Sequence, residues 1–314
     1  MAHWFEKNEV RRFPRIDMPV QVFVMPVSPI RDKQIYALGY DYFSPTVTRK
    51  LQKAKNDLNY WIRLIQEQKD ILEPVFQEAV DLTDTFGQLI RMVSTGTNPM
   101  KDVAERQNIQ AMISGFLSIQ TLRGPAPKTF EYFDMMNQKF IAYTQNFVES
   151  LSQSTQNQFK INPKIPTEFE IDKTLAIFQT PQFEQAPLAQ SLYHLAKYID
   201  LHIRIYLSFL KDLVPRKSSP TSWPKEKTSM SACGMALKVN KRIPIHTKLE
   251  TLLYFSETKE VLKLKSTVVR NLSLFDEGVE SNALNFDFPT DQDQRLIERQ
   301  QELYQISRCL ELVM

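Results

Sequence analysis

Apolar residues recur at every seventh position between residues 51 and 93, and a second series, apolar except at Gln68, follows three positions after the first. A repeat of this kind predicts a helix whose apolar seam packs against other helices along its length. Pro74 falls inside the pattern, where it removes a backbone donor, so we expect a bend near Leu72 or a division into two helices. The two series are Leu51, Leu58, Ile65, Leu72, Ala79, Phe86 and Val93, and Ala54, Trp61, Gln68, Val75, Leu82 and Leu89.

Helical spacing continues at about residues 101–122, 129–152, 184–213 and 291–312. Ser44-Pro45 supplies an N-cap and a first-turn proline for the seam helix. Thr290 and Asp293 form a capping pair before the last helix, whose predicted apolar face is Leu296, Leu303, Ile306 and Leu310. The stretch PRKSSPTSWPKEK, residues 215–227, predicts a mobile linker because prolines, serines and lysines dominate it.

Strand patterns flank this helical middle. Residues 17–43 predict two short strands, and four more runs follow the linker: GMALKV, TKLETLLYF, VLKLKSTVV and NALNFDF. Six short antiparallel strands with a closing helix indicate a small barrel. The sequence therefore predicts an α+β protein in which residues 1–44 and 222–314 form a split β-barrel, and residues 45–221 form a helical insertion with its linker.

Composition excludes several classes of function. The net charge of +3 over 314 residues is too small for a typical DNA- or RNA-binding domain. The two cysteines have no metal-ligand or disulfide spacing, and the N-terminal stretch and the apolar runs predict neither a signal peptide nor a membrane span, so a cytoplasmic protein is expected. The four histidines have no metal spacing, and His202 falls on an apolar seam, where a core histidine is favoured. We find no catalytic motif and expect no enzyme, no metal and no cofactor.

Two short motifs stand beside predicted strands. The first is RRFPR, residues 11–15, and the second is SMSACG, residues 229–234. In these residues the chain resembles the PilZ domains, six-stranded β-barrels that act as receptors for the bacterial second messenger cyclic di-GMP. The family's motifs are RxxxR before the first strand and [D/N]xSxxG at the start of a later one. This chain departs from the second motif at Ser229, where the family has Asp or Asn. The resemblance covers residues 8–43 and about 225–314.

The resemblance implies a cyclic di-GMP site made of Arg11, Arg12, Arg15, Ser229, Ser231 and Gly234. A guanidinium group can donate bidentate hydrogen bonds to phosphate oxygens, or to O6 and N7 of guanine. A hydroxyl at residue 229 removes an acceptor suited to the guanine N1 and N2 donors. Each motif also has a structural interpretation: the arginines as a basic tail, Ser231 as a turn cap and Gly234 as a tight bend of a barrel.

The resemblance further implies a non-enzymatic bacterial signalling effector, an atypical PilZ-like barrel that couples cyclic di-GMP occupancy to an unidentified protein partner. The alternative is a degenerate scaffold that binds no cyclic di-GMP and acts through helix-mediated assembly. The heptad seam fits an intramolecular bundle or a homo-oligomer through helices at residues 46–93. We expect a dimer or tetramer in which the half from Leu51 to Leu72 supplies most of the contact.

Overall fold

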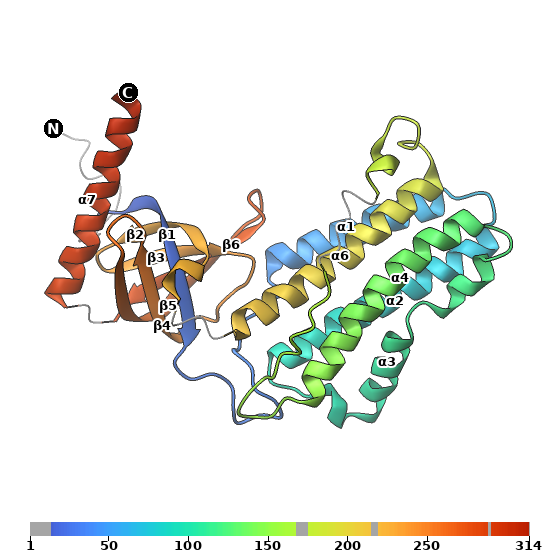
Figure 1. Ribbon diagram of the computed structural model, residues 1–314, viewed down its shortest axis with the longest axis horizontal. Coiled ribbons are helices and arrows are strands. Elements are labelled where there is room, and N and C mark those ends of the chain that lie inside the picture. The colour runs from blue at the N-terminus through green and yellow to red at the C-terminus, as the bar shows by residue number, and fades with distance from the viewer. Residues whose placement is uncertain (1–13, 168–174, 215–218, 288–289, 314) are drawn as a thin grey trace. The chain divides into compact units, whose positions relative to one another are not determined.

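The computed structural model describes residues 14–167, 175–214, 219–287 and 290–313. The chain forms two compact units, shown in Figure 1. The barrel unit comprises Met1–Ser28 and Pro215–Met314, and the helical unit comprises Pro29–Val214. The boundary therefore falls near residue 28, earlier than the predicted residue 44.

The barrel unit contains six antiparallel strands that close into a ring in the order β1-β2-β3-β6-β5-β4 (Figure 1). Alternation places Met18, Val20 and Val22 of the first strand in the barrel core. The prediction of an α+β protein with six antiparallel strands is confirmed. The strands are β1 (Ile16–Pro26), β2 (Lys225–Ser231), β3 (Gly234–Val239), β4 (Lys248–Phe255), β5 (Glu260–Leu274) and β6 (Val279–Phe286).

The predicted division of the strands was wrong, because one strand precedes the helices and five follow them. Residues 36–43 were expected to form a second early strand, but the structure has no strand there, and Ala37 makes an isolated bridge to Ile30. Their aromatic rings pack in the helical unit instead: Tyr42 lies edge-on to Phe209 and donates a hydrogen bond to Asp212 Oδ2 at 2.8 Å. Aromatic enrichment here reflects burial against helices.

The strand that the sequence pattern did not predict is β2, and it lies partly inside the predicted mobile linker. Its sequence KEKTSMS carries little apolar signal, yet it pairs with β1 on one side and β3 on the other. The residues before it are also fixed. Trp223 is buried and stacks on Phe23 with ring centroids 6.1 Å apart, and Gln21 Nε2 donates to the carbonyl oxygens of Thr221 and Trp223. Residues 219–227 are therefore part of the barrel.

The last helix, α7 (Asp291–Val313), begins at the predicted capping pair. Thr290 N donates to Asp293 Oδ2 at 2.9 Å, and Asp293 N donates to Thr290 Oγ1 at 3.2 Å. Its first half packs on the barrel through buried Ile297. The predicted apolar face was only partly right, because Ile306 and Leu310 are 57% and 58% exposed.

The helical unit is built from five described α-helices and three short 3-10 helices. α1 packs along α6, and α6 also contacts α2 and α4 (Figure 1). No described helix is long and apolar enough to cross a membrane. The α-helices are α1 (Pro45–Arg63), α2 (Lys69–Ser94), α3 (Val103–Ser114), α4 (Pro127–Ser152) and α6 (Pro187–Leu213), and the 3-10 helices are η1 (Pro99–Lys101), η2 (Leu117–Leu122) and η3 (Ala176–Gln179).

The heptad seam is divided between α1 and α2, but the division falls at residues 64–68 and not at the predicted bend near Leu72. Pro74 is accommodated inside α2. Gln68, expected at a seam position, is exposed with φ 53°, and its Nε2 donates to Pro125 O at 3.2 Å. α1 has already ended at Arg63, and the left-handed Gln68 is the N-cap from which α2 starts, so the two helices cannot continue as one.

The two halves of the seam are covered to different extents. In α2, Phe86 packs edge-on against Phe140 and Phe147 of α4 and Tyr206 of α6, so this half is buried within the chain. α1 buries only three residues, and Tyr60 is 59% exposed. The intramolecular bundle therefore accounts for the α2 half of the seam.

His202 is a core histidine, as its place on the apolar seam predicted. It is buried, and its Nδ1–H donates to Tyr198 O at 3.0 Å. Burial lowers the pKa of the imidazole. A Cβ atom on Gly87 would lie 2.6 Å from His202 Cδ2, so the glycine makes room for the ring.

Candidate functional site

Antiparallel pairing brings the two sequence motifs together at one end of the barrel. Ile16 of β1 faces Met230 of β2, and Asp17 faces Ser229. Arg15, directly before Ile16, therefore lies beside Ser231 by continuation of the register. Arg11 and Arg12 fall outside the described residues. The structure thus juxtaposes Arg15 with the second motif although more than two hundred residues separate them.

Ser231 is buried, and its hydroxyl takes part in a turn. Its Oγ donates to Gly234 O at 3.2 Å and lies 3.5 Å from Cys233 Sγ. Ser231 and Gly234 are paired residues of β2 and β3, so Ala232 and Cys233 form the two-residue loop between them. These contacts match the turn-cap interpretation of Ser231.

Gly234 is required by the approach of a neighbouring strand. It pairs with Asn285 of β6, and a Cβ atom on it would lie 2.4 Å from Leu284 O. That distance is far inside van der Waals contact, and the obstructing atom belongs to the backbone, which cannot rotate away. The geometry matches the barrel interpretation of this glycine.

The outward side of β1 and β2 carries the polar groups that remain available. Arg15 and Asp17 are two residues apart and therefore share one face of β1. Arg15 is half-buried, Asp17 is exposed and Ser229 is half-buried. Ser229 pairs on its other side with Ala236 of β3. A guanidinium, a carboxylate and a hydroxyl thus stand together on the outer sheet surface, a set that can bind a ligand carrying both acceptors and donors.

Asp17 is not among the site residues that the two motifs predict. Its position two residues after Arg15 indicates a common face of the strand, but nothing in the sequence places it opposite Ser229. That contact follows from the register of β1 on β2.

Helix α7 reaches the same end of the barrel. Gln301 is buried, and its Nε2 donates to Met230 O at 2.6 Å. Met230 pairs with Ile16, the first residue of β1. The helix therefore fixes the strand ends on which Arg15 and Ser229 stand.

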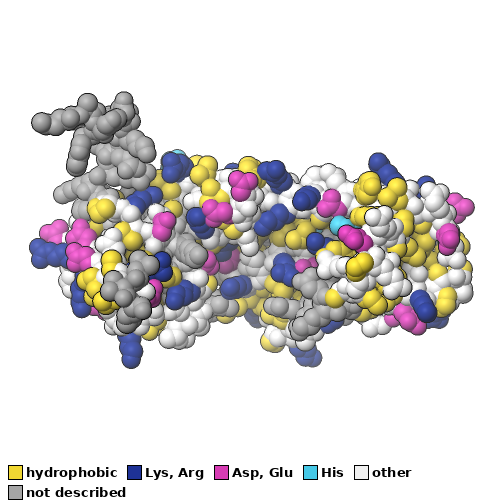
Figure 2. All heavy atoms as spheres, turned by 90° about the horizontal axis from the view of Figure 1, so that it is seen from above, with side chains coloured by type: hydrophobic (Ala, Val, Ile, Leu, Met, Phe, Trp, Pro, Cys, Tyr) yellow, Lys and Arg dark blue, Asp and Glu magenta, His cyan; other side chains and the backbone are white. Residues whose placement is uncertain are grey.

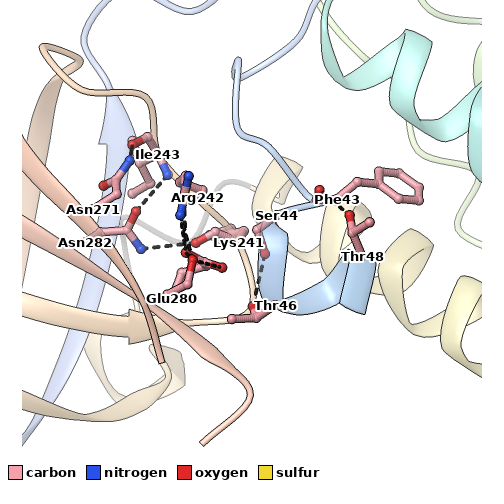
Figure 3. Close-up of polar contacts among 11 residues, drawn as sticks. Phe43, Ser44, Thr46, Thr48, Lys241, Arg242, Ile243, Asn271, Glu280 and Asn282 are labelled. Carbon is pink, nitrogen blue, oxygen red and sulfur yellow. Dashed lines mark hydrogen bonds and ion pairs between the residues drawn. The ribbon is translucent and has the colours of Figure 1, made fainter. Parts of the chain in front are cut away.

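The barrel also holds a polar cluster that the sequence did not indicate (Figure 3). Glu280 is completely buried on the inward face of β6. Its Oε2 lies 3.1 Å from the guanidinium of Arg242 and accepts a hydrogen bond of 3.0 Å from Ser273 Oγ. Arg242 NH2 in turn donates to Ser273 Oγ at 2.7 Å. Arg242 and Ser273 thus both stabilise a buried carboxylate.

Two asparagines fix the loop that carries Arg242. Asn282 is buried, its Oδ1 accepts from Ile243 N at 2.8 Å, and its Nδ2 donates to Lys241 O at 3.1 Å (Figure 3). Asn271 Nδ2 donates to Ile243 O at 2.9 Å. These bonds satisfy the backbone of a loop folded against the barrel. The cluster is a structural device that holds the connection from β3 to β4.

Within the described ranges, no group of three or more histidine, cysteine, aspartate or glutamate side chains could hold a metal ion. Separately, the register of β1 on β2 and of β2 on β3 brings Arg15 and the second motif together at one end of the barrel.

The chain is remotely similar to a solved protein structure. No protein-family model matches the chain, and no curated protein matches it. A solved structure from Xanthomonas campestris is similar, described as a pathogenic protein with a tetrameric PilZ domain self-assembled through a helical bundle. The two chains share 19% identity, the match covers 48% of this chain and 83% of that one, and the TM-score is 0.26.

Proposed function

We propose that this chain is a non-enzymatic, cytoplasmic receptor of PilZ type that binds cyclic di-GMP on the outer face of β1 and β2. The observation that carries the proposal is the juxtaposition of Arg15 with the Ser229–Gly234 motif, set by the β1–β2 register. Arg11 and Arg12 complete the arginine motif in sequence. The guanidinium groups supply the forked donors that phosphate and guanine accept.

Ser231 and Gly234 act in this proposal through the shape of the site. Since the Ser231 hydroxyl bonds to Gly234 O, the pair sets the tight turn beside Arg15. Ser229 keeps an outward hydroxyl next to Asp17. The alternative function, a scaffold without cyclic di-GMP binding, is favoured by the absence of a carboxylate or amide at residue 229.

Replacing Arg15 with alanine is expected to weaken cyclic di-GMP binding at least about tenfold, since one good forked contact is worth roughly 1–3 kcal/mol. Binding to the parent protein should also weaken as salt rises, because exposed charge-assisted contacts are screened. Isothermal titration calorimetry measures both effects.

The matched control is Arg106→Ala, which removes an exposed arginine from α3 in the helical unit. It should leave the affinity unchanged. Equal affinity of the Arg15→Ala protein and the parent would rule out this site, and no binding by the parent would favour the scaffold.

We further propose that the chain forms a homo-oligomer through α1, so that several barrels are displayed together. The support is the incomplete burial of this helix and its C-cap residue: Tyr60 is 59% exposed, Trp61 is half-buried, and the C-cap Leu64 is 38% exposed. Large apolar side chains reach the surface of the helical unit (Figure 2). A second copy can cover this face by isologous pairing.

Replacing Tyr60 and Leu64 together with aspartate is expected to convert the oligomer to a monomer, which multi-angle light scattering detects across a concentration series. Leu58 and Ile65 are unsuitable targets, because they are 0% and 4% exposed inside the unit and their replacement would disturb folding. Val103→Asp, at a 64% exposed position on α3, is the control that should keep the oligomer. A monomeric parent protein would overturn the oligomer.

A further inference from the structure

Asp17 lies next to Ser229, the position at which the site lacks a carboxylate or amide hydrogen-bond acceptor. The direct pairing of Asp17 with Ser229 places the two Cβ atoms about 4.5–5.5 Å apart on the outer face of the sheet. Asp17 is exposed, and its carboxylate makes no hydrogen bond or ion pair with any side chain that the structure describes. A carboxylate on β1 therefore lies within one side-chain length of the hydroxyl on β2.

Arg15 and Asp17 together present complementary halves of a recognition surface. The guanidinium donates, and guanine accepts at O6 and N7. The carboxylate accepts, and the N1–H and N2 amino groups of guanine donate. Residues i and i+2 of a strand lie on one face, so both groups can contact one base lying across the strand.

The side chains next to Asp17 on the neighbouring strands are short. Ser229 and Ala236 occupy the same row on β2 and β3, next to Asp17. Neither side chain projects as far as Arg15 or Asp17. A planar base can therefore approach the sheet beside the two charged groups.

We propose that Asp17 determines the specificity of the site for guanine by accepting hydrogen bonds from N1–H and the N2 amino group, in place of an acceptor at residue 229. This assignment rests on the proposed function, since it concerns the same ligand. Ser229 then contributes only a hydroxyl at the edge of the base. The acceptor that Ser229 lacks is then supplied by Asp17 on the adjacent strand β1.

The test compares cyclic di-GMP with its hypoxanthine analogue, which keeps O6, N7 and both phosphates but lacks the N2 amino group. The full-length parent should prefer cyclic di-GMP at least about tenfold, as expected for one lost base-edge contact. Asp17→Ala should weaken cyclic di-GMP binding by about the same factor and abolish the preference. Asp17→Asn keeps one acceptor oxygen and should retain part of the preference. Calorimetry measures all three proteins.

The control is Asp276→Ala, which removes an exposed carboxylate from the turn between β5 and β6 and so matches the change in net charge. It should leave the preference intact. The assignment is overturned if Asp17→Ala keeps the preference for guanine, or if it weakens both nucleotides equally. A parent protein that binds neither nucleotide overturns the proposed function itself, and this assignment with it.

Discussion

Replacing Arg242 with methionine is expected to lower the free energy of unfolding of the barrel by about 3 kcal/mol, at the lower end of the range for breaking a buried ion pair. Glu280 has no exposed side-chain surface, so it cannot recover hydration when the guanidinium is removed. The hydrogen bond from Ser273 remains and limits the loss. Methionine keeps most of the apolar stem of arginine, so lost packing contributes little.

Urea unfolding followed by tryptophan fluorescence measures this loss. In a background of Trp4→Phe and Trp61→Phe, the remaining Trp223 is buried against Phe23 and reports on the barrel alone. A reporter inside one unit is needed because two units can unfold in separate transitions.

The matched control is Lys238→Met, which breaks the exposed pair with Glu277 in the same barrel. Exposed pairs contribute up to about 1 kcal/mol, so a small change is expected. The Arg242→Met protein carrying Glu280→Gln as well should recover part of the loss, because no charge then remains buried. Equal losses for Lys238→Met and Arg242→Met would contradict a special role for the buried pair.

Replacing Gly234 with alanine is expected to destabilise the barrel by about 2–3 kcal/mol, the upper part of the range for overpacking. The new Cβ would sit 2.4 Å from Leu284 O, so β3 and β6 must separate locally. The same Trp223 fluorescence assay records the shift of the unfolding midpoint. Gly124→Ala is the control, because nothing lies within 4 Å of a Cβ atom at that position; its unfolding is followed by circular dichroism, since Gly124 belongs to the helical unit.

This substitution also separates the two interpretations of the glycine. If Gly234 serves the barrel, the Gly234→Ala protein is less stable whether or not cyclic di-GMP is present. An unchanged unfolding midpoint combined with lost cyclic di-GMP binding would instead show that the glycine serves the ligand. The short distance to a backbone oxygen favours the first outcome.

Local sequence patterns predicted much of the helical unit. The apolar spacing of α2, α4 and α6 matches the faces that these helices bury, as Phe86, Phe140 and Tyr206 show. The capping pair Thr290 and Asp293 also predicted the start of α7 correctly. Such features are local, because a helix closes its hydrogen bonds within four residues and records its buried face in its own sequence.

The elements that were mispredicted depend on distant partners. The polar strand β2 exists because β1 and β3 satisfy its backbone on both sides, a condition its own residues do not encode. The aromatic residues near Tyr42 look like a strand but pack against α6. The pattern of a segment indicates that it is buried, whereas its partner decides which structure it adopts.

The residue pattern alone indicates a helical unit within a β-rich one, and it contains the two motifs and the candidate residues Arg15 and Ser229. How those residues are used depends on contacts between distant segments. Strand register placed Asp17 beside Ser229, committed the Ser231 hydroxyl to a turn and required glycine at residue 234. Register is fixed by backbone pairing between segments more than two hundred residues apart, and a shift of one residue would turn every side chain to the other face of the sheet.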